Sequence, residues 1–386
     1  MRESPVIVVE PKEMTALQEF YETNELPYDW VFLGRKAIYA PSLTARDGHL
    51  TEMTVDGDIS NLEPLSSLTA LQKLDQMEHG SLKADLRPLA RLTRLTRLQL
   101  CSDSVCDLSP LAGLKRLNSL SLYCGRIEDL SPLAGLNSLK SLDLYSTKVV
   151  DLTPLKALTG LTDLTLAPNR LAALEPLAGL RKLKRLDLRN ISLSDLTPLA
   201  RLSNLNKLLL DHNPGLVMEP LRKINSLTEL HLHDSEISDL APLAGLSRLE
   251  KLFAQNNLIS DLGPLAGLAS LRKLNLSNNK ICDLSPLADL AALNTLNLSQ
   301  NEISDLGPLA RLANLDDLNL KDNIISEVTP LAGLTTLQSL DLRNNRIADL
   351  EPLSDLTSLN SLRVADNKLR RFSDQKLIRP RDEDWG

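Results

Sequence analysis

The sequence predicts an α/β solenoid of about 15 short coils, in which parallel strands stack on one another. One observation behind this fold class is a Pro-Leu pair that returns at a fixed period. The other is that leucine fills most apolar positions, while aromatic residues make up only 3% of the 386 residues. After a first interval of 24 residues, every interval between the paired prolines is 22 residues: Pro64, Pro88, Pro110, Pro132, Pro154, Pro176, Pro198, Pro220, Pro242, Pro264, Pro286, Pro308, Pro330 and Pro352.

A single unit, residues 110–131, shows why the units must stack. Leu120 and Leu122 alternate with polar neighbours, which is the period of a strand. Pro110 has no N–H to donate and therefore fits the start of a tight turn or a short 3₁₀ segment. A 22-residue unit has no room for a long helix after its strand, and burial of its own apolar side chains does not offset the entropy lost on ordering it. Each unit is therefore stabilised by its neighbours.

The repeated unit contains the pattern L-x-x-L-x-L-x-x-N-x-I-x-D-L, which is nearly complete in residues 271–284 and 293–306. In this pattern the chain resembles the leucine-rich repeat family, specifically the 22-residue class shared by bacterial internalins and a eukaryotic regulatory subunit of protein phosphatase 1. The resemblance covers residues 50–369. It implies a leucine-rich repeat arc with a parallel β-sheet on the concave face and 3₁₀ or irregular turns on the convex face.

Asparagine stands at one position of the pattern in eight units. Because its amide both donates and accepts, it can satisfy backbone groups in the turn and between neighbouring units. We therefore expect a structural role for Asn169, Asn213, Asn257, Asn279, Asn301, Asn323, Asn345 and Asn367. Asp103, Gly125, Thr147, Ile191 and Ser235 depart from this pattern.

The two ends of the chain lie outside the repeat. Residues 1–49 hold six of the eleven aromatic residues, with strand-like segments VIVV and WVFLG around a helix-like segment, PKEMTALQEFYE. We expect an N-terminal α/β cap on the first repeat; the alternative is a separate recognition element. The solenoid then spans residues 50–369, and residues 370–386 form a charged C-terminal tail.

Composition limits the classes of partner. The net charge of −7 gives no strongly basic surface, so we expect no nucleic acid partner. No stretch approaches the length of apolar residues that spans a bilayer, and the N-terminus lacks a signal-peptide apolar core. We expect a cytoplasmic, bacterial monomer that has no membrane partner and no cofactor. Its four cysteines, Cys101, Cys106, Cys124 and Cys282, are expected to be free thiols.

Residues that alternate with the inward leucines of each strand face the concave surface. In the middle units these residues include aromatic, histidine and charged side chains, with an exposed row of Leu209, His231 and Phe253. Such residues are typical of interface hot spots. The candidate partner-binding residues are Tyr123, Tyr145, Asp187, Arg189, Leu209, Asp211, His231, His233 and Phe253.

The favoured function is a non-catalytic scaffold that binds another protein on its concave face. The basic residues Arg91, Arg94, Lys115, Arg116, Arg181 and Lys182 leave the convex face as a second possible surface. Resemblance to the eukaryotic member of the class leaves open a regulatory subunit of a phosphatase-like enzyme. A third alternative is metal binding, or a metal-dependent enzyme, through His231 and His233 with Asp211 or His212 as third ligand. An open groove excludes water poorly, so we expect neither catalytic nor metal-binding residues.

Overall fold

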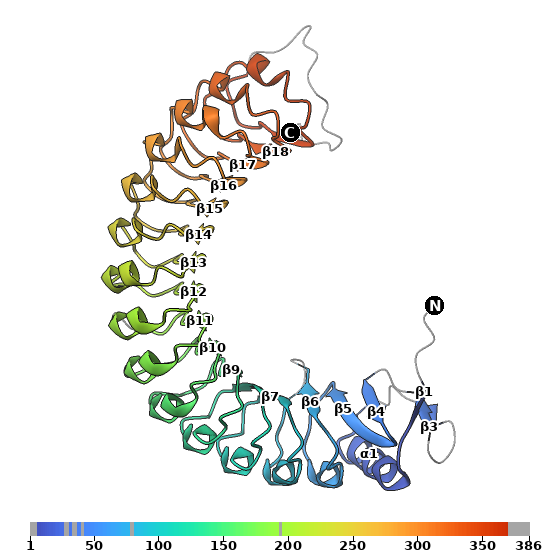
Figure 1. Ribbon diagram of the computed structural model, residues 1–386. Helices are drawn as coiled ribbons and strands as arrows, with labels where there is room; N and C mark the ends of the chain where they lie inside the picture. Colours follow the sequence, from blue (N-terminus) through green and yellow to red (C-terminus); the bar gives the residue numbers. More distant parts are fainter. Residues whose placement is uncertain are drawn as a thin grey trace. The chain divides into compact units, whose positions relative to one another are not determined.

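The computed structural model describes residues 6–26, 31–32, 37–39, 42–77, 81–192 and 195–369. The chain divides into two compact units, Met1–Ile191 and Ser192–Gly386. Each unit carries an open sheet on one side and 3₁₀ turns on the opposite side (Figure 1). The predicted solenoid of parallel strands and 3₁₀ turns is therefore confirmed within each unit.

The solenoid sheet of the first unit begins with an antiparallel hairpin, β4 and β5. It continues with parallel strands, each hydrogen-bonded to the strand before it. Its strands are β4 (Leu43–Arg46), β5 (His49–Val55), β6 (Lys73–Gln76), β7 (Arg97–Ser102), β8 (Ser119–Cys124), β9 (Ser141–Asp143), β10 (Asp163–Thr165) and β11 (Arg185–Asp187). Its 3₁₀ turns are η1 (Glu63–Ser67), η2 (Arg87–Arg91), η3 (Ser109–Leu111), η4 (Ser131–Leu133), η5 (Thr153–Ala157) and η6 (Glu175–Gly179).

The second unit is entirely parallel in its described residues, and its register follows the sequence period, since Leu230 pairs with Leu252 and Leu252 with Leu274. Its strands are β12 (Lys207–Leu209), β13 (Glu229–His231), β14 (Lys251–Phe253), β15 (Lys273–Asn275), β16 (Thr295–Asn297), β17 (Asp317–Asn319), β18 (Ser339–Asp341) and β19 (Ser361–Arg363). Its 3₁₀ turns are η7 (Thr197–Arg201), η8 (Glu219–Lys223), η9 (Ala241–Leu243), η10 (Gly263–Leu265), η11 (Ser285–Leu287), η12 (Gly307–Arg311), η13 (Thr329–Leu331) and η14 (Glu351–Leu353).

The periodic proline explains the position of each 3₁₀ turn. In η3, Pro110 occupies one of the first positions, where a missing N–H leaves no partner unsatisfied. The N–H of the next residue, Leu111, donates to the carbonyl of Leu108 at 2.9 Å. The carboxylate of Asp107 accepts the N–H of Ser109 at 2.8 Å and so starts the turn. The same arrangement recurs along both units.

The leucines of the repeat form a continuous core inside each unit. Leu120, Leu122, Leu144 and Leu188 are all 0% exposed. The prediction that these four side chains are buried is confirmed.

The repeat asparagines link neighbouring coils through their amides. The Nδ2 of Asn279 donates to the carbonyls of Ala254 and Leu276, both at 3.0 Å, and its Oδ1 accepts the N–H of Ile259 at 3.0 Å. The predicted structural role of the asparagine is thus confirmed. Where Asp103 and Gly125 replace it, β7 and β8 extend to six residues each.

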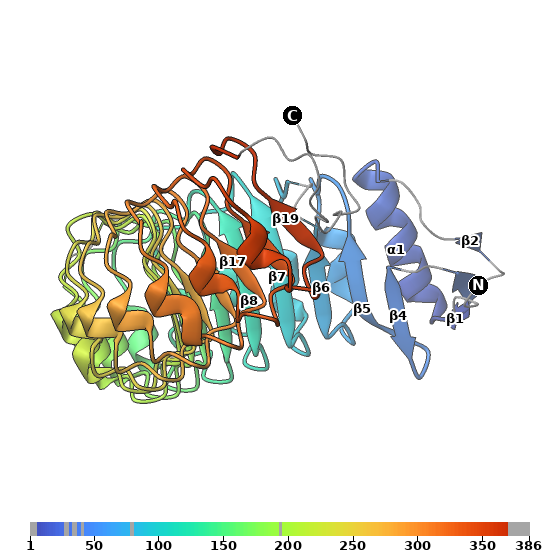
Figure 2. The ribbon, with the colours of Figure 1, turned by 90° about the horizontal axis from the view of Figure 1, so that it is seen from above.

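At the N-terminus, α1 (Pro11–Thr23) packs against η1 and the first strands (Figure 2). Glu13 accepts the N–H of Leu50 at 2.7 Å, and Asn24 accepts the N–H of Ser60 at 2.6 Å. A small antiparallel sheet precedes the solenoid, in the order β1 (Val6–Val8), β3 (Ala37–Tyr39) and β2 (Val31–Phe32). The N-terminal cap stays a prediction.

Two expectations for the ends fall partly or wholly outside the described residues. Of the segment WVFLG, only Val31 and Phe32 are described, while the charged tail at 370–386 lies outside them. The only α-helix in the described part of the chain has 13 residues, and none of its described helices is long and apolar enough to cross a membrane.

Candidate functional site

We use the name strand face for the surface formed by the side chains that alternate with the buried leucines; the sequence predicts this surface to be concave. The nine candidate residues fall into two groups on it. Tyr123, Tyr145, Asp187 and Arg189 belong to the first unit, and Leu209, Asp211, His231, His233 and Phe253 belong to the second. Each group is described within its own unit.

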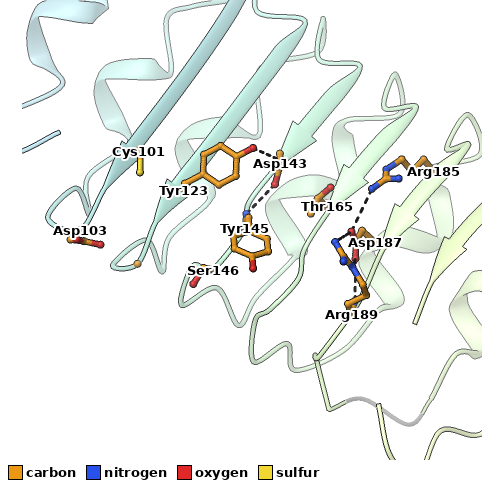
Figure 3. Close-up of a pocket in the computed structure, with 11 residues that line it drawn as sticks. Cys101, Asp103, Tyr123, Asp143, Tyr145, Ser146, Thr165, Arg185, Asp187 and Arg189 are labelled. Atoms are coloured by element: carbon orange, nitrogen blue, oxygen red, sulfur yellow. Dashed lines mark hydrogen bonds and ion pairs between the residues drawn. The ribbon is translucent and has the colours of Figure 1, made fainter. Parts of the chain in front are cut away.

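The first group borders a hollow of about 520 Å³ on the strand face, called here the tyrosine hollow (Figure 3). Two tyrosines from neighbouring coils form one wall. The ring centroids of Tyr123 and Tyr145 are 6.1 Å apart and the rings are tilted by 57°. Tyr145 is 44% exposed. The hollow is lined by Cys101, Asp103, Tyr123, Gly125, Asp143, Tyr145, Ser146, Thr165, Arg185, Asp187 and Arg189.

Asp143 holds the two tyrosines in place. Its carboxylate accepts the hydroxyl of Tyr123 at 3.3 Å and the backbone N–H of Tyr145 at 3.1 Å (Figure 3). Burial raises the pKa of the Asp143 carboxyl, although both hydrogen bonds and the charge of Arg185 work in the opposite direction. The hollow therefore contains a carboxylate that is only partly compensated by its protein partners.

The opposite wall is an ion pair between Asp187 and two arginines. Asp187 is 0% exposed; its carboxylate accepts the Nε and a terminal guanidinium N–H of Arg189 at 2.8 and 2.7 Å, and Arg185 lies 3.5 Å away. Asp187 thus faces outward from the leucine core, as the alternation predicts, but the guanidinium groups cover it. Arg185 and Arg189 retain side-chain exposures of 35% and 40%.

Two cysteines, Cys101 and Cys124, lie on the neighbouring strands β7 and β8. Burial raises the pKa of the Cys124 thiol to about 12, so it is protonated and unreactive near neutral pH. Cys101 is half-buried in the lining. All four cysteines are free thiols in the structure.

The second group forms a set of charged and histidine contacts on β13 and the turns beside it. Glu229 lies at its centre, with Lys207 in contact on one side and Lys251 at 3.1 Å on the other. The Nε2 of His231 lies 2.9 Å from Glu229 Oε1. Glu229 and the two lysines therefore form a cross-strand charge ladder.

His231 and His233 point outward, but to different partners. The ring of His231 lies against that of Phe253, with centroids 4.5 Å apart. His233 lies between two carboxylates, with Nε2 at 3.2 Å from Asp211 Oδ2 and Nδ1 at 2.7 Å from Asp234 Oδ2. The Nδ1 of His231 also lies 3.9 Å from Asp211 Oδ2, but the shorter contacts of the two histidines go to different carboxylates, Glu229 and Asp234.

The expected exposed row of Leu209, His231 and Phe253 is corrected, since the side chain of His231 is only 21% exposed, and Asp211 is covered as well. Leu209 is only 6% exposed, and it pairs in register with His231 on the next strand. Phe253 is half-buried rather than exposed, because it packs against His231. Asp211 is 1% exposed, since its carboxylate accepts the N–H of His233 at 3.0 Å and lies beneath the histidine rings.

Comparison with known proteins agrees with this geometry. A family model described as Leucine Rich repeats (2 copies) matches residues 247–289 and 335–376. An internalin (inlF) from Listeria monocytogenes is 29% identical, covers 86% of this chain and 92% of its own, and superposes with a TM-score of 0.62. The chain is a leucine-rich repeat protein. No curated protein sequence matches it.

Two further structures share the fold with this leucine-rich repeat protein. A leucine-rich repeat protein of Leptospira interrogans is 22% identical over 81% of this chain and 88% of its own, with a TM-score of 0.68. The ectodomain of an Arabidopsis thaliana receptor kinase, solved in complex with CASPARIAN STRIP INTEGRITY FACTOR 2, is 22% identical over 83% of this chain and 44% of its own, with a TM-score of 0.61. Homologues of this kind suggest protein–protein interaction in general.

Sequence reasoning did not select Asp143, Arg185 or Asp234 as site residues of this leucine-rich repeat protein. The repeat period does place Asp143 and Arg185 near the other site residues. Asp143 stands on the strand one coil after Tyr123, and Arg185 lies two residues before Asp187 on the same strand. Their hydrogen bonds depend on side-chain rotamers, which the period does not determine. Asp234 lies at a left-handed backbone position, with φ of 55°, where alternation along a strand no longer applies.

The ion pairs of Glu229 predict a pH-dependent stability for this leucine-rich repeat protein. Burial works to raise the pKa of Glu229, but hydrogen bonds from Lys207, His231 and Lys251 outweigh it and lower the pKa from 4.5 to about 2. A lowered pKa in the folded state stabilises the fold above pH 4.5, and this contribution is lost as the pH falls toward about 2. We expect its size to be on the order of 2 kcal/mol, because the group is partly solvated.

Urea unfolding at a series of pH values tests this expectation. The free energy of unfolding should fall less steeply below pH 4.5 in Glu229→Gln than in the wild type. Parallel curves for the two proteins would show that Glu229 does not carry the effect. Glu327→Gln, at an exposed carboxylate in the same unit, serves as the control and should follow the wild-type curve.

Proposed function

We propose that the chain is a non-catalytic scaffold that binds a partner protein on the strand face of its first unit, with the tyrosine hollow at the centre. The observation that carries this proposal is the 44% exposure of Tyr145 beside a second tyrosine, at the edge of a hollow of about 520 Å³. Exposed aromatic side chains beside a rigid wall are typical of binding hot spots. The short, hydrogen-bonded coils keep this surface in one conformation in the absence of a partner. This lowers the conformational entropy lost on binding.

The charges around the hollow favour a partner that presents a lysine or arginine side chain. Arg185 and Arg189 are already paired with Asp187, whereas Asp103 and Asp143 add negative charge to the lining. Tyrosine faces attract cations, and a carboxylate beside them strengthens the attraction. A phosphate backbone would meet like charge there, which favours a polypeptide over a nucleic acid.

Affinity capture with matched variants tests the proposal. Tyr123→Ala/Tyr145→Ala removes the aromatic wall, so we expect partner capture to weaken by at least about tenfold while the melting temperature stays nearly unchanged. Leu258→Ala is the control, because Leu258 has the same 44% exposure as Tyr145 but belongs to the second unit and not to the hollow. Equal capture by the wild type and the double variant would place the binding surface elsewhere.

A second measurement tests the charge of the partner. Peptide libraries panned against the full chain should be enriched in lysine or arginine at one position, and Asp143→Asn should remove that preference. Asp163→Asn, a carboxylate on the strand face of β10 that does not line the hollow, should retain it. Enrichment of acidic peptides instead would contradict the proposed chemistry.

The oligomeric state and the compartment of the protein are also part of the proposal. We propose that the protein acts as a monomer in a reducing compartment such as the cytoplasm, where the half-buried Cys101 of the hollow stays reduced. The alternative partner is a phosphatase-like enzyme, which the resemblance to the eukaryotic member of the class suggests. Sedimentation at micromolar concentration tests the oligomeric state directly.

A further inference from the structure

Two histidines and a carboxylate meet at one edge of the strand face in the second unit. Ligand atoms of His212, His233 and Asp234 all lie within 4.8 Å of one another. Asp234 Oδ2 lies 2.7 Å from His233 Nδ1 and 4.0 Å from His212 Nδ1. The rings of His212 and His233 touch, with centroids 4.8 Å apart.

The period of the repeat explains why these groups meet. His212 and Asp234 occupy equivalent positions of adjacent coils, both with left-handed backbone, at φ of 58° and 55°. At this position the side chains of neighbouring coils contact each other elsewhere too, as Asn278 and Asn256 do at 3.0 Å. A histidine in one coil followed by His-Asp in the next therefore places three potential ligands together.

A buried carboxylate supports the central histidine from behind. Asp211 Oδ2 lies 3.2 Å from His233 Nε2, and the side chain of Asp211 is only 2% exposed. Metal-bound histidines commonly donate their second ring N–H to a carboxylate, which fixes the tautomer and the ring orientation. With Nε2–H directed to Asp211, the lone pair of His233 Nδ1 points toward Asp234 and His212.

We propose that His212, His233 and Asp234 bind one zinc ion, with Asp211 positioning His233 and water completing the coordination. Zinc accepts imidazole nitrogen and carboxylate oxygen at about 2.0–2.2 Å, and three protein ligands leave one position open. Zinc takes the lone pair of His233 Nδ1, so a proton held at Nδ1 in the metal-free protein leaves to solvent when the ion binds. The side chain of His212 is 54% exposed, so its ring can turn to close the ligand distances.

This site differs from the pair His231 and His233 that the sequence suggests. The Nε2 of His231 lies 2.9 Å from Glu229, which Lys207 and Lys251 also contact. Phe253 covers the other side of its ring. His231 is a neighbouring histidine of similar burial that is none of the three proposed ligands, although its Nδ1 lies 3.9 Å from Asp211 Oδ2, and it therefore serves as the control for the zinc ligands.

Calorimetric titration of the untagged full chain with zinc chloride tests the proposal at neutral pH under reducing conditions. We expect one ion per chain, abolished stoichiometric binding in His212→Ala and in His233→Ala, and unchanged affinity in His231→Gln. Asp211→Asn should weaken zinc binding by about 10–100-fold through the orientation of His233. Circular dichroism shows whether each variant is folded. His212 is exposed, so His212→Ala is expected to fold and tests the site even if Asp211→Asn unfolds.

Cobalt substitution identifies the ligands independently. A tetrahedral visible spectrum without a thiolate charge-transfer band is expected for nitrogen and oxygen ligands, and it should disappear in His212→Ala. A thiolate band would assign the metal to a cysteine such as the exposed Cys106 or Cys282 and overturn the proposal. The proposal would also be overturned if the wild type bound no stoichiometric zinc. The same holds if His231→Gln lost zinc binding while His212→Ala kept it.

Discussion

Replacing Leu188 with Ala is expected to lower the free energy of unfolding by about 2–5 kcal/mol, the range found for truncating a fully buried leucine. Leu188 is 0% exposed and stands between Asp187 and Arg189, immediately after β11. Its removal leaves a cavity directly beneath the ion pair that forms one wall of the tyrosine hollow. The core cannot close this cavity easily, because the register with the neighbouring strand is fixed.

Urea unfolding followed by circular dichroism measures this loss. Leu318→Ala is the matched control, since Leu318 is also 0% exposed but belongs to β17 of the second unit. Both variants should lose similar stability, whereas only Leu188→Ala should also weaken partner capture at the hollow. A loss below about 1 kcal/mol for Leu188 would show that the core repacks around the smaller side chain.

The period of the sequence was sufficient to predict the fold of each unit. The Pro-Leu pairs fixed the 3₁₀ turns, Leu120 and Leu122 fixed a strand, and Asn279 fixed the bonds between coils. These predictions succeed because period and burial reinforce each other in every coil. The N-terminal helix α1 was also predicted, from the helix-like segment PKEMTALQEFYE.

Exposure on the strand face could not be predicted in the same way. Alternation correctly placed Asp187, Asp211 and Leu209 outside the leucine core, yet all three are buried. They are covered by longer side chains on the same strand or the next, such as Arg189 over Asp187 and the ring of His233 beside Asp211. Whether an outward residue is exposed depends on the rotamers of its neighbours, which a single-sequence pattern does not determine.

The histidines illustrate the same limit in the candidate site. The spacing of His231 and His233 suggested one shared ion, because alternate strand residues lie on the same face. In the structure, Glu229 and Phe253 engage His231, while His233 turns toward Asp234. The partner that completes the group, His212, stands 21 residues before His233 in the sequence, so only the stacking of coils brings the two rings together.

Replacing Asn301 with Ala is expected to destabilise the protein by about 3–5 kcal/mol, because it leaves several buried backbone groups without partners. The Nδ2 of Asn301 donates to the carbonyls of Leu276 and Leu298 at 3.0 Å each, and its Oδ1 accepts the N–H of Ile281 at 3.0 Å. The side chain is inside the coil, with the residue only 9% exposed. Water cannot readily replace these hydrogen bonds, so the backbone carbonyls and the N–H stay desolvated without a partner, which destabilises the folded state.

Urea unfolding of Asn301→Ala, Asn301→Asp and Asn360→Ala tests this role. Asn301→Asp keeps the acceptor but loses the donors, so we expect it to be destabilised as well. Asn360→Ala changes an exposed asparagine at the start of a strand and should remain close to the wild type. Equal stability of Asn301→Ala and Asn360→Ala would mean that the asparagine ladder contributes little, and that the leucine core alone holds neighbouring coils together. Because the same bonds recur from Asn257 to Asn367, a large effect at Asn301 would extend to each coil of the second unit that carries them.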